Sequence, residues 1–473
     1  MTLQTPILAI LIVWVACWCH SPLGADEIPR DQVQPKDLLQ LFEVDNSQLR
    51  FLQDGAAVGP EETETIQRIL FLLPRFDDVI ISNWSTKTPD QEDLLRDPDT
   101  HRTKFFRVTG FVQNLTETEL SPEAANRFGF DHFYIVDVRT TQNQLAKICV
   151  RNLPKNWPEN LTETPPLPIS CDAMYLKSGD SSAPSQSLIF ATKRLRWHPT
   201  QPHIELGVST GSALLASHGF DVSRFAELTQ RRPLGDTDRP CFYELMSTVG
   251  KIDDNWLSRS NQSTTLDIVS ALKTPTANAG QLIRLHGLAR RAIRIRVDDK
   301  DIQNHFGIRE YFEVELFVPL EQSLKLVDPN TQAERMYHSY PMTVCCRELP
   351  DGMPQGDYVR QPIEVDAFFL KLWSYQSRSS DANDRKQRVR QICPLLIART
   401  VRLAKTPLTK NTVPSWSLVV IVFGTVIVAW GMSRWYRRAD QRFHSYRRRS
   451  QSTTPDFDNI ATPSPEADSS NES

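Results

Sequence analysis

The sequence predicts an α+β protein with an internal duplication, in which each copy is a short helical segment followed by a five-stranded β-barrel, plus one C-terminal transmembrane helix. Three observations support this prediction. Two long stretches resemble each other in the same order, each passes from helical to strand-like patterns, and residues 416–432 are apolar. The 473 residues leave room for several domains, and the formal net charge of -3 gives no overall preference for nucleic acid.

Residues 1–25 are the first element, and we predict that they are a secretory signal peptide. The segment PILAILIVWVACW (residues 6–18) is apolar but short for a membrane span, and the stretch SPLGADE, rich in small residues, follows it. Cleavage near Ala25 would remove the segment. Because MTLQTP at the start lacks the usual Lys or Arg, an uncleaved anchor stays the alternative.

The duplication divides the next part of the chain into copy 1, residues 37–203, and copy 2, residues 212–405. LLQLFEVDNSQLRFLQDGAAV aligns without a gap with LLASHGFDVSRFAELTQRRPL at one constant offset. Five further matches follow in the same order: RVTGFV (107–112) with RLHGLA (284–289), FGFDHFYIVDV (128–138) with FGIREYFEVEL (306–316), ICVRNLP (148–154) with VCCRELP (344–350), CDAMYLK (171–177) with VDAFFLK (365–371), and LIFATK (188–193) with LLIART (395–400). Chance does not explain a series in one order.

Each copy begins with a predicted helical segment, at residues 37–80 in copy 1 and 212–256 in copy 2. Asp45 and Asp221 occupy matching positions and have the side chain of a typical N-cap residue. After the helix start at Pro60, apolar residues follow with helical spacing. These residues are Ile66, Ile69, Leu70 and Leu73.

The second part of each copy, residues 100–200 and 280–405, has the pattern of about five short strands. Gly110 and Gly287 fall inside the first strand of each set, where glycine lets a strand bend at a barrel corner. The order of strands, with RNLP or RELP and then DAMYLK or DAFFLK, resembles an OB-fold, a five-stranded Greek-key barrel. The resemblance implies a face that binds oligonucleotides or oligosaccharides.

Residues 416–432, WSLVVIVFGTVIVAWGM, contain no charged residue and have about the minimum length of a transmembrane helix. Aromatic residues flank the stretch and an arginine cluster follows it, which predicts that residues 433–473 form a cytoplasmic tail, basic and then disordered. The large N-terminal part would then be exported, to the periplasm or the cell exterior. A buried core helix is the alternative, but the arginines and aromatic rims have no reason to flank one.

Polar residues recur in the two barrels, Arg151 and Arg347 among them, and six of the others are the candidate ligand-binding residues. They are Arg107, Asp172, Lys177, Arg284, Asp366 and Lys371. The OB-fold resemblance implies that they line a groove for an anion or a sugar. The alternative is structural: they occupy outward positions of strands and pair across the sheet.

Cysteine spacing predicts no zinc or redox site, because no two cysteines are separated as in CxxC. If the barrel order holds, the third and fifth strands are neighbours, and a disulfide from Cys345 or Cys346 to Cys393 is predicted for an oxidising compartment. The sequence indicates no cofactor and no metal site. It contains no HExxH, GxSxG, Walker or dinucleotide-binding motif, so we do not predict an enzyme.

The function expected from the sequence is that of a single-pass cell-membrane protein of the cell envelope, of structural or interaction type. Its partners would be the lipid bilayer, through the transmembrane helix, and an envelope protein or polymer. The alternative is a ligand-binding sensor or carrier module for an oligosaccharide or a small anion, with its groove near Lys177 or Lys371. Nucleic acid is not an expected partner, because the basic footprint is missing.

Overall fold

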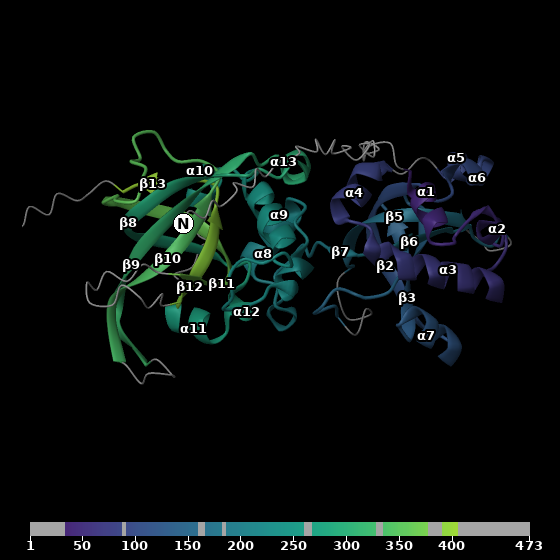
Figure 1. Cartoon of the computed structure of the whole chain (residues 1–473), viewed down its shortest axis with the longest axis horizontal. Helices are drawn as coiled ribbons and strands as arrows, with labels where there is room; N and C mark the ends of the chain where they lie inside the picture. The colour runs from purple at the N-terminus through teal and green to yellow at the C-terminus, as the bar shows by residue number, and fades with distance from the viewer. Residues whose placement is uncertain are drawn as a thin grey trace, which may run out of the picture. The chain divides into compact units, whose positions relative to one another are not determined.

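The computed structural model describes residues 34–87, 91–158, 166–181, 186–259, 267–327, 334–376 and 390–404. They form a mixed α+β protein with two β-sheets, and each sheet is accompanied by helices (Figure 1). We call residues 34–203 the first module and residues 204–404 the second. The predicted signal peptide, the predicted span at 416–432 and the tail lie outside the described residues. Within the described ranges, no helix combines the length and apolar character needed to cross a membrane.

The first module opens with helices whose starts follow local sequence signals. Its helices are α1 (Pro35–Leu41), α2 (Asn46–Leu49), α3 (Pro60–Leu72), η2 (Leu73–Arg75), α4 (Asp78–Trp84), α5 (Gln91–Arg96), α6 (Pro98–His101) and α7 (Pro122–Phe128). The Asp45 side chain accepts hydrogen bonds from the backbone N–H groups of Ser47 and Gln48, which makes it the predicted N-cap of α2. The apolar stripe of α3 is buried, with Ile69 and Leu70 fully enclosed.

The first sheet contains a closed ring of five strands. Its strands are β1 (Thr86–Lys87), β2 (Phe105–Glu119), β3 (His132–Thr140), β4 (Leu145–Val150), β5 (Pro168–Ser178), β6 (Leu188–Thr192) and β7 (Arg196–Trp197). The strand order is β1-β2-β3-β4-β6-β5-β7, and β5 also pairs with β2. Strands β2, β3, β4, β6 and β5 therefore form a barrel, in which the third and fifth ring strands, β4 and β6, run parallel.

The second module repeats this plan. Its helices are η3 (Ile204–Leu206), α8 (Thr210–Ser217), η4 (Val222–Glu227), α9 (Arg239–Val249), α10 (Asp254–Arg259), α11 (Ile268–Lys273), α12 (Pro275–Asn278) and α13 (Lys300–Phe306). Its strands are β8 (Leu282–Arg296), β9 (Glu310–Val327), β10 (Glu334–Cys346), β11 (Gln361–Gln376), β12 (Arg390–Ala398) and β13 (Arg402–Leu403). The order is β12-β10-β9-β8-β11-β13, and the additional β12–β11 pairing closes the ring.

The two rings agree in register as well as in strand order. Arg107 lies opposite Asp172 on β2 and β5, and Arg284 lies opposite Asp366 on β8 and β11. The register shifts of β2 and β8 follow the aligned residues Val112 and Ala289, and those of β5 and β11 follow Tyr175 and Phe369. Such bulges bend a strand locally, so the two barrels turn at the same places.

The structure corrects one sequence match by a single residue. Sequence similarity aligned LIFATK with LLIART, which pairs Ala191 with Ala398. In the sheets, Ala191 lies opposite Cys149, whereas Ile397 lies opposite the matching Cys345. Ala191 therefore corresponds to Ile397. Both runs are almost entirely apolar, and their letters alone do not fix the register.

Gly110 and Gly287 are required by the close approach of a neighbouring strand. A Cβ atom on Gly110 would lie 2.3 Å from the Arg139 carbonyl oxygen, and one on Gly287 would lie 2.5 Å from the Phe317 carbonyl oxygen. No side chain fits at such distances. The predicted use of these glycines in the barrel is consistent with this geometry.

Each barrel has a filled interior and a second apolar layer against its helices. In the first module, Tyr175 and Phe190 lie in the interior cluster, while Met174 and Ala191 pack with α3. The second module repeats the arrangement: Phe369 and Leu396 fill the interior, while Phe368 and Ile397 pack with α9. Because alternate residues of a strand face opposite sides, one strand contributes to both layers.

Candidate functional site

The two recurrent aspartates each bind two arginines across the sheet. Both lie on the fourth strand of the barrel sequence, β5 or β11, and are almost fully buried. The distances are Arg107 Nε–Asp172 Oδ1 2.9 Å, Arg196 Nη2–Asp172 Oδ2 2.7 Å, Arg284 Nε–Asp366 Oδ1 2.7 Å and Arg402 Nη2–Asp366 Oδ2 2.5 Å. Both carboxylate oxygens are used, so these residues form internal ion pairs on matching strands.

The two recurrent lysines are fully buried, and each binds a carboxylate from the helical part of its own module. Lys177 Nζ lies 2.6 Å from Glu62 Oε1, and Lys371 Nζ lies 2.6 Å from Asp238 Oδ2. The side chains of Lys371 and Asp238 have no exposed surface. A buried charge is tolerated only when it is paired and hydrogen-bonded, so each lysine requires its acidic partner.

Both carboxylates also accept backbone hydrogen bonds, and the donors correspond between the modules. Glu62 accepts from Gln53 N at 2.7 Å and Gly59 N at 2.8 Å. Asp238 accepts from Thr229 N at 2.8 Å and Gly235 N at 3.2 Å. Burial acts to raise the pKa of Asp238, but the hydrogen bonds from Lys371, Thr229 and Gly235 more than offset it and lower the pKa.

Main-chain contacts complete the same junction in both modules. Gly55 N donates to the Ser178 carbonyl at 3.3 Å, and Arg231 N donates to the Leu372 carbonyl at 2.8 Å. Gly55 and Arg231 are aligned, and both have a positive φ. We call the carboxylate, the lysine and these main-chain contacts the helix–barrel junction. A binding role for the six recurrent residues stays a prediction, but the contacts described here are all internal.

Sequence reasoning missed Glu62 and Asp238, although a signal was present. The two residues are aligned at the constant offset of the helical segments, yet they differ in type and so do not look like a repeat. Their lysine partners lie 115 and 133 residues further along the chain. Comparing charge instead of residue identity at the offset would have found them.

The predicted disulfide from Cys345 or Cys346 to Cys393 does not form in the structure. All six described cysteines are buried free thiols. Strands β10 and β12 are neighbours, as expected, but Cys345 lies opposite Ile397. Cys393 is four residues before Ile397, which places it roughly 13 Å along the strand, beyond the reach of a disulfide. The Cys393 Sγ instead accepts a hydrogen bond from Trp373 Nε1 at 2.9 Å.

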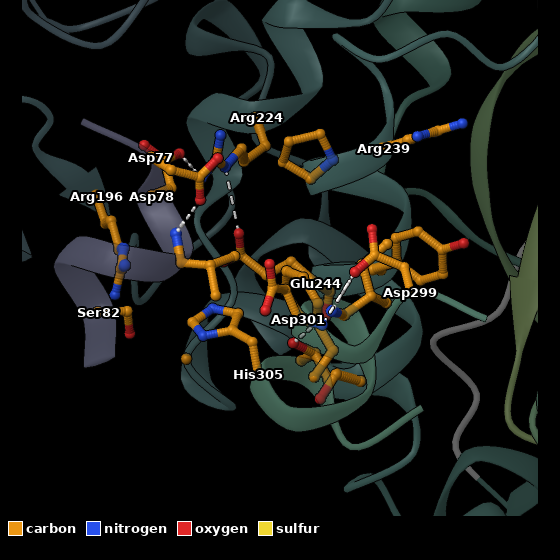
Figure 2. A pocket seen from close by; sticks show the side chains of 18 of the residues that line it. Asp77, Asp78, Ser82, Arg196, Arg224, Arg239, Glu244, Asp299, Asp301 and His305 are labelled. Atoms are coloured by element: carbon orange, nitrogen blue, oxygen red, sulfur yellow. Dashed lines mark hydrogen bonds and ion pairs between the residues drawn. The ribbon is translucent and has the colours of Figure 1, made fainter. Parts of the chain in front are cut away.

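A pocket of about 600 Å³ is lined by residues of both modules. Figure 2 shows Ser82 and Arg196 on one side of it, and Arg239 and Asp299 on the other. The first module contributes the start of α4, Arg107 on β2 and the segment after β6. The second module contributes α9 and α13. None of the recurrent lysines lines this pocket.

Reciprocal ion pairs join the two modules beside the pocket. Arg224 of the second module reaches Asp78 of the first, with Nη2–Oδ2 at 3.1 Å, and Asp78 also binds Lys193 at 2.6 Å. In the opposite direction, Arg194 of the first module binds Asp221 of the second at 2.8 Å. Burial acts to raise the pKa of Asp78, but Arg224 and Lys193 more than offset it and lower the pKa to about 2. Asp78 is therefore ionised at neutral pH.

His305 on α13 faces the same pocket. Burial lowers the pKa of His305, and the nearby positive charges of Arg196 and Arg107 lower it further. Its imidazole is therefore neutral at pH 7, with one nitrogen able to donate and the other able to accept. Within the described ranges, no group of three or more His, Cys, Asp or Glu side chains is placed to hold a metal ion.

Comparison with known proteins gives no relative from which a role could be taken. No protein-family model and no curated protein matches this chain. Among solved structures, a small single-stranded DNA-binding protein from Streptomyces coelicolor aligns with 26% of this chain and 92% of its own length, at 12% identity and a TM-score of 0.16. The score is too low to support any conclusion about fold or role.

Proposed function

We propose that this chain is a membrane-anchored protein of the cell envelope, of structural or interaction type, with two exported OB-type modules. The observation that carries the proposal is the helix–barrel junction. Each recurrent lysine binds a carboxylate of its own module, and each recurrent aspartate binds arginines of its own module. Such internal contacts make each module rigid. Two rigid modules are suited to binding partners on their surfaces.

Two further features support an OB-type barrel that arose by duplication. The rings share the strand order first, second, third, fifth and fourth, with the fourth strand returning to the first. This is the connectivity of a five-stranded Greek-key barrel. The shared register and bulges reach beyond what two unrelated small barrels would have in common.

The membrane anchor rests on the sequence of residues 416–432 and on the arginines that follow it. Protease protection in sealed membrane vesicles tests it. We expect the tail to be digested only when the protease has access to the cytoplasmic side. Recovery of the intact chain in the supernatant after washing with carbonate would contradict the anchor.

A non-enzymatic role agrees with how two acidic groups of the pocket, Asp78 and Glu244, are used. Asp78 binds two cations, and Glu244 binds Arg224 at 3.3 Å and accepts from Asp221 N at 3.0 Å. A carboxylate with a pKa of about 2, such as Asp78, gives up its proton too readily to act as a general acid near neutral pH.

The interaction role is tested by affinity capture with the full-length chain in detergent, using solubilised envelope as the source of partners. We expect a specific envelope protein or polymer to be retained. The variant compared with it is Lys371→Met, which breaks one helix–barrel junction while leaving the module surface residues unchanged. Equal capture by this variant, or capture of nothing by either protein, would count against the proposal.

A second candidate function is ligand binding of the sensor or carrier type. The pocket shared by both modules favours it, because Arg239, Tyr243 and Ser247 of its α9 wall have no counterparts of the same chemistry in the first module. Packing residues are expected to recur after a duplication, whereas a binding site added later is expected in one module only. This candidate moves the site from Lys177 and Lys371 to the pocket.

A further inference from the structure

One face of α9 and of the turn after it presents a polar stripe to the pocket. Arg239, Tyr243, Ser247 and Lys251 follow each other at intervals of four residues, and all four line the pocket. Residues four apart lie one above the other on a helix face. The stripe therefore forms one continuous wall, with a cation at each end and two hydroxyl groups between them.

The polar groups of this wall are available to a ligand. Among the described residues, the side chains of Tyr243, Ser247 and Lys251 have no hydrogen-bond or ion-pair partner, and neither has His305 across from them on α13. Arg239 has only Asp236, at 3.3 Å, and both side chains are largely exposed. An exposed pair of this kind contributes little and does not hold the guanidinium in place.

The opposite wall differs, because its cations are already paired. Arg107 and Arg196 bind Asp172, and Lys193 binds Asp78. These pairs hold the first-module side of the pocket in position, although Asp172 is shared by two arginines and leaves positive charge in excess there. On the stripe, Lys251 has no ion-pair partner among the described residues. The cations on both walls favour a ligand that carries a negative group.

The stripe as a whole has no equivalent in the first module. At the constant offset, the first-module counterparts of Arg239, Tyr243, Ser247 and Lys251 are Thr63, Gln67, Phe71 and Arg75. Phe71 and Arg75 stack on each other, with the guanidinium 4.5 Å from the ring centroid, and neither lines this pocket. Only the second module combines two cations with two hydroxyls on this face.

Aromatic rings also line the pocket beside the stripe. Tyr243 and Phe306 of α13 are stacked, with ring centroids 6.0 Å apart and an interplanar angle of 27°. Both rings line the pocket. A pyranose ring packs its C–H face on an aromatic ring, while its hydroxyls need donors and acceptors at the edge. Ser247, His305 and Asp299 line the same pocket and supply these groups.

We propose that the pocket binds an anionic sugar, that is, a sugar unit bearing a carboxylate or a phosphate ester, with the anion at Lys251 and the ring against Tyr243. The pocket volume of about 600 Å³ suits a ligand of one to three sugar units. The inference rests on the second candidate function above and does not depend on the membrane anchor.

The test is isothermal titration calorimetry on the full-length chain in detergent. The probes are trigalacturonate for a carboxylate, glucose 6-phosphate for a phosphate ester, maltotriose for a neutral sugar, and inorganic phosphate for a bare anion. We expect one of the two anionic sugars to bind at least 10-fold more tightly than both maltotriose and inorganic phosphate. Raising the salt concentration should weaken that binding, because the anion is held by charge.

Pocket variants test whether the sugar binds in the pocket. Lys251→Met and Tyr243→Ala should each weaken it at least 10-fold, while Lys273→Met, at an exposed lysine of α11 outside the pocket, should leave it unchanged. Circular dichroism spectra should match for all variants. Binding that both pocket variants leave intact, tighter binding of maltotriose, phosphate binding equal to the sugar, or no binding of any probe would overturn the proposal. Capture of an envelope partner is measured in a separate assay, so its failure is distinguished from a failure of sugar binding.

Discussion

The first and second modules fasten their helices to their barrels in the same way but with different acids. Glu62 is the third residue of α3, whereas Asp238 precedes the first residue of α9. Each carboxylate nevertheless accepts from the matching two backbone N–H groups and from the matching lysine. The position of the carboxylate oxygens is what the two modules share. The longer Glu62 side chain reaches back from the third residue of α3, and the shorter Asp238 side chain starts at the residue before α9.

The modules differ on the face of the same helix that points away from the barrel. The first module places Phe71 and Arg75 there, and the second places Tyr243, Ser247 and Lys251 at the pocket. The contrast separates two kinds of polar residue. The recurrent aspartates and lysines of β5 and β11 make ion pairs inside their own module, and we propose that the residues of the stripe bind a ligand.

The largest expected effect comes from removing one lysine of a helix–barrel junction. Lys371→Met leaves Asp238 charged and fully buried without its cation, and we expect a loss of about 3–5 kcal/mol in the free energy of unfolding. Lys177→Met should cost less, because the Glu62 side chain retains 7% exposure. Urea unfolding followed by tryptophan fluorescence measures both.

The matched control for these variants is Arg294→Met, whose pair with Glu310 is exposed and 3.8 Å long. We expect it to change stability by less than about 1 kcal/mol. If the two lysine variants fell in the same range as this control, the junctions would not be what stabilises the modules.

A smaller effect is expected at the barrel glycines, and it should be similar in the two modules. Gly110→Ala and Gly287→Ala each force a Cβ atom against a carbonyl of the neighbouring strand, which should cost about 1–3 kcal/mol. Gly235→Ala is the control, since a Cβ there meets nothing within 4 Å. Thermal unfolding would contradict the barrel geometry if all three variants behaved alike.

The smallest effect concerns the ion pairs between the modules and depends on pH. The pKa of Asp78 is about 2 in the folded protein, against an ordinary value of 3.8. Its stabilising contribution is therefore present above about pH 4 and is lost as the pH falls towards 2. Asp78→Asn should cost about 1–2 kcal/mol at pH 7 and little at pH 2.

Unfolding measured from pH 7 to pH 2 checks this prediction, with Asp236→Asn as the control because that side chain is 93% exposed. A cost for Asp78→Asn that did not change over this range would show that the carboxylate charge is not what joins the modules.

Local patterns predicted the strands, the barrel glycines and the Asp45 N-cap, because each depends on residues close in sequence. The partners of Lys177 and Lys371 could not be predicted in this way, since they lie more than a hundred residues away and differ between the modules. The register of β6 and β12 was wrong by one residue, because uniform apolar runs align equally well at two offsets. The disulfide prediction failed for a related reason: neighbouring strands were expected, but the position along them was not known.

The pocket was beyond prediction for a different reason. The spacing of Arg239, Tyr243, Ser247 and Lys251 is visible in the sequence, but a polar stripe on a helix usually faces solvent. Only the placement of α13 and of the first-module residues turns this stripe into a wall. The predicted membrane span and signal peptide lie outside the described residues and stay predictions.

The most direct test of the account is a double-mutant cycle on Lys371 and Asp238, with free energies of unfolding for Lys371→Met, Asp238→Asn and the double variant. If the recurrent lysine fastens α9 to the barrel through this carboxylate, each single variant should lose several kcal/mol. The double variant should then lose less than their sum, by about 2 kcal/mol or more. Additive losses, each below about 1 kcal/mol, would contradict the claim that the most faithfully repeated polar residues serve the structure of the modules.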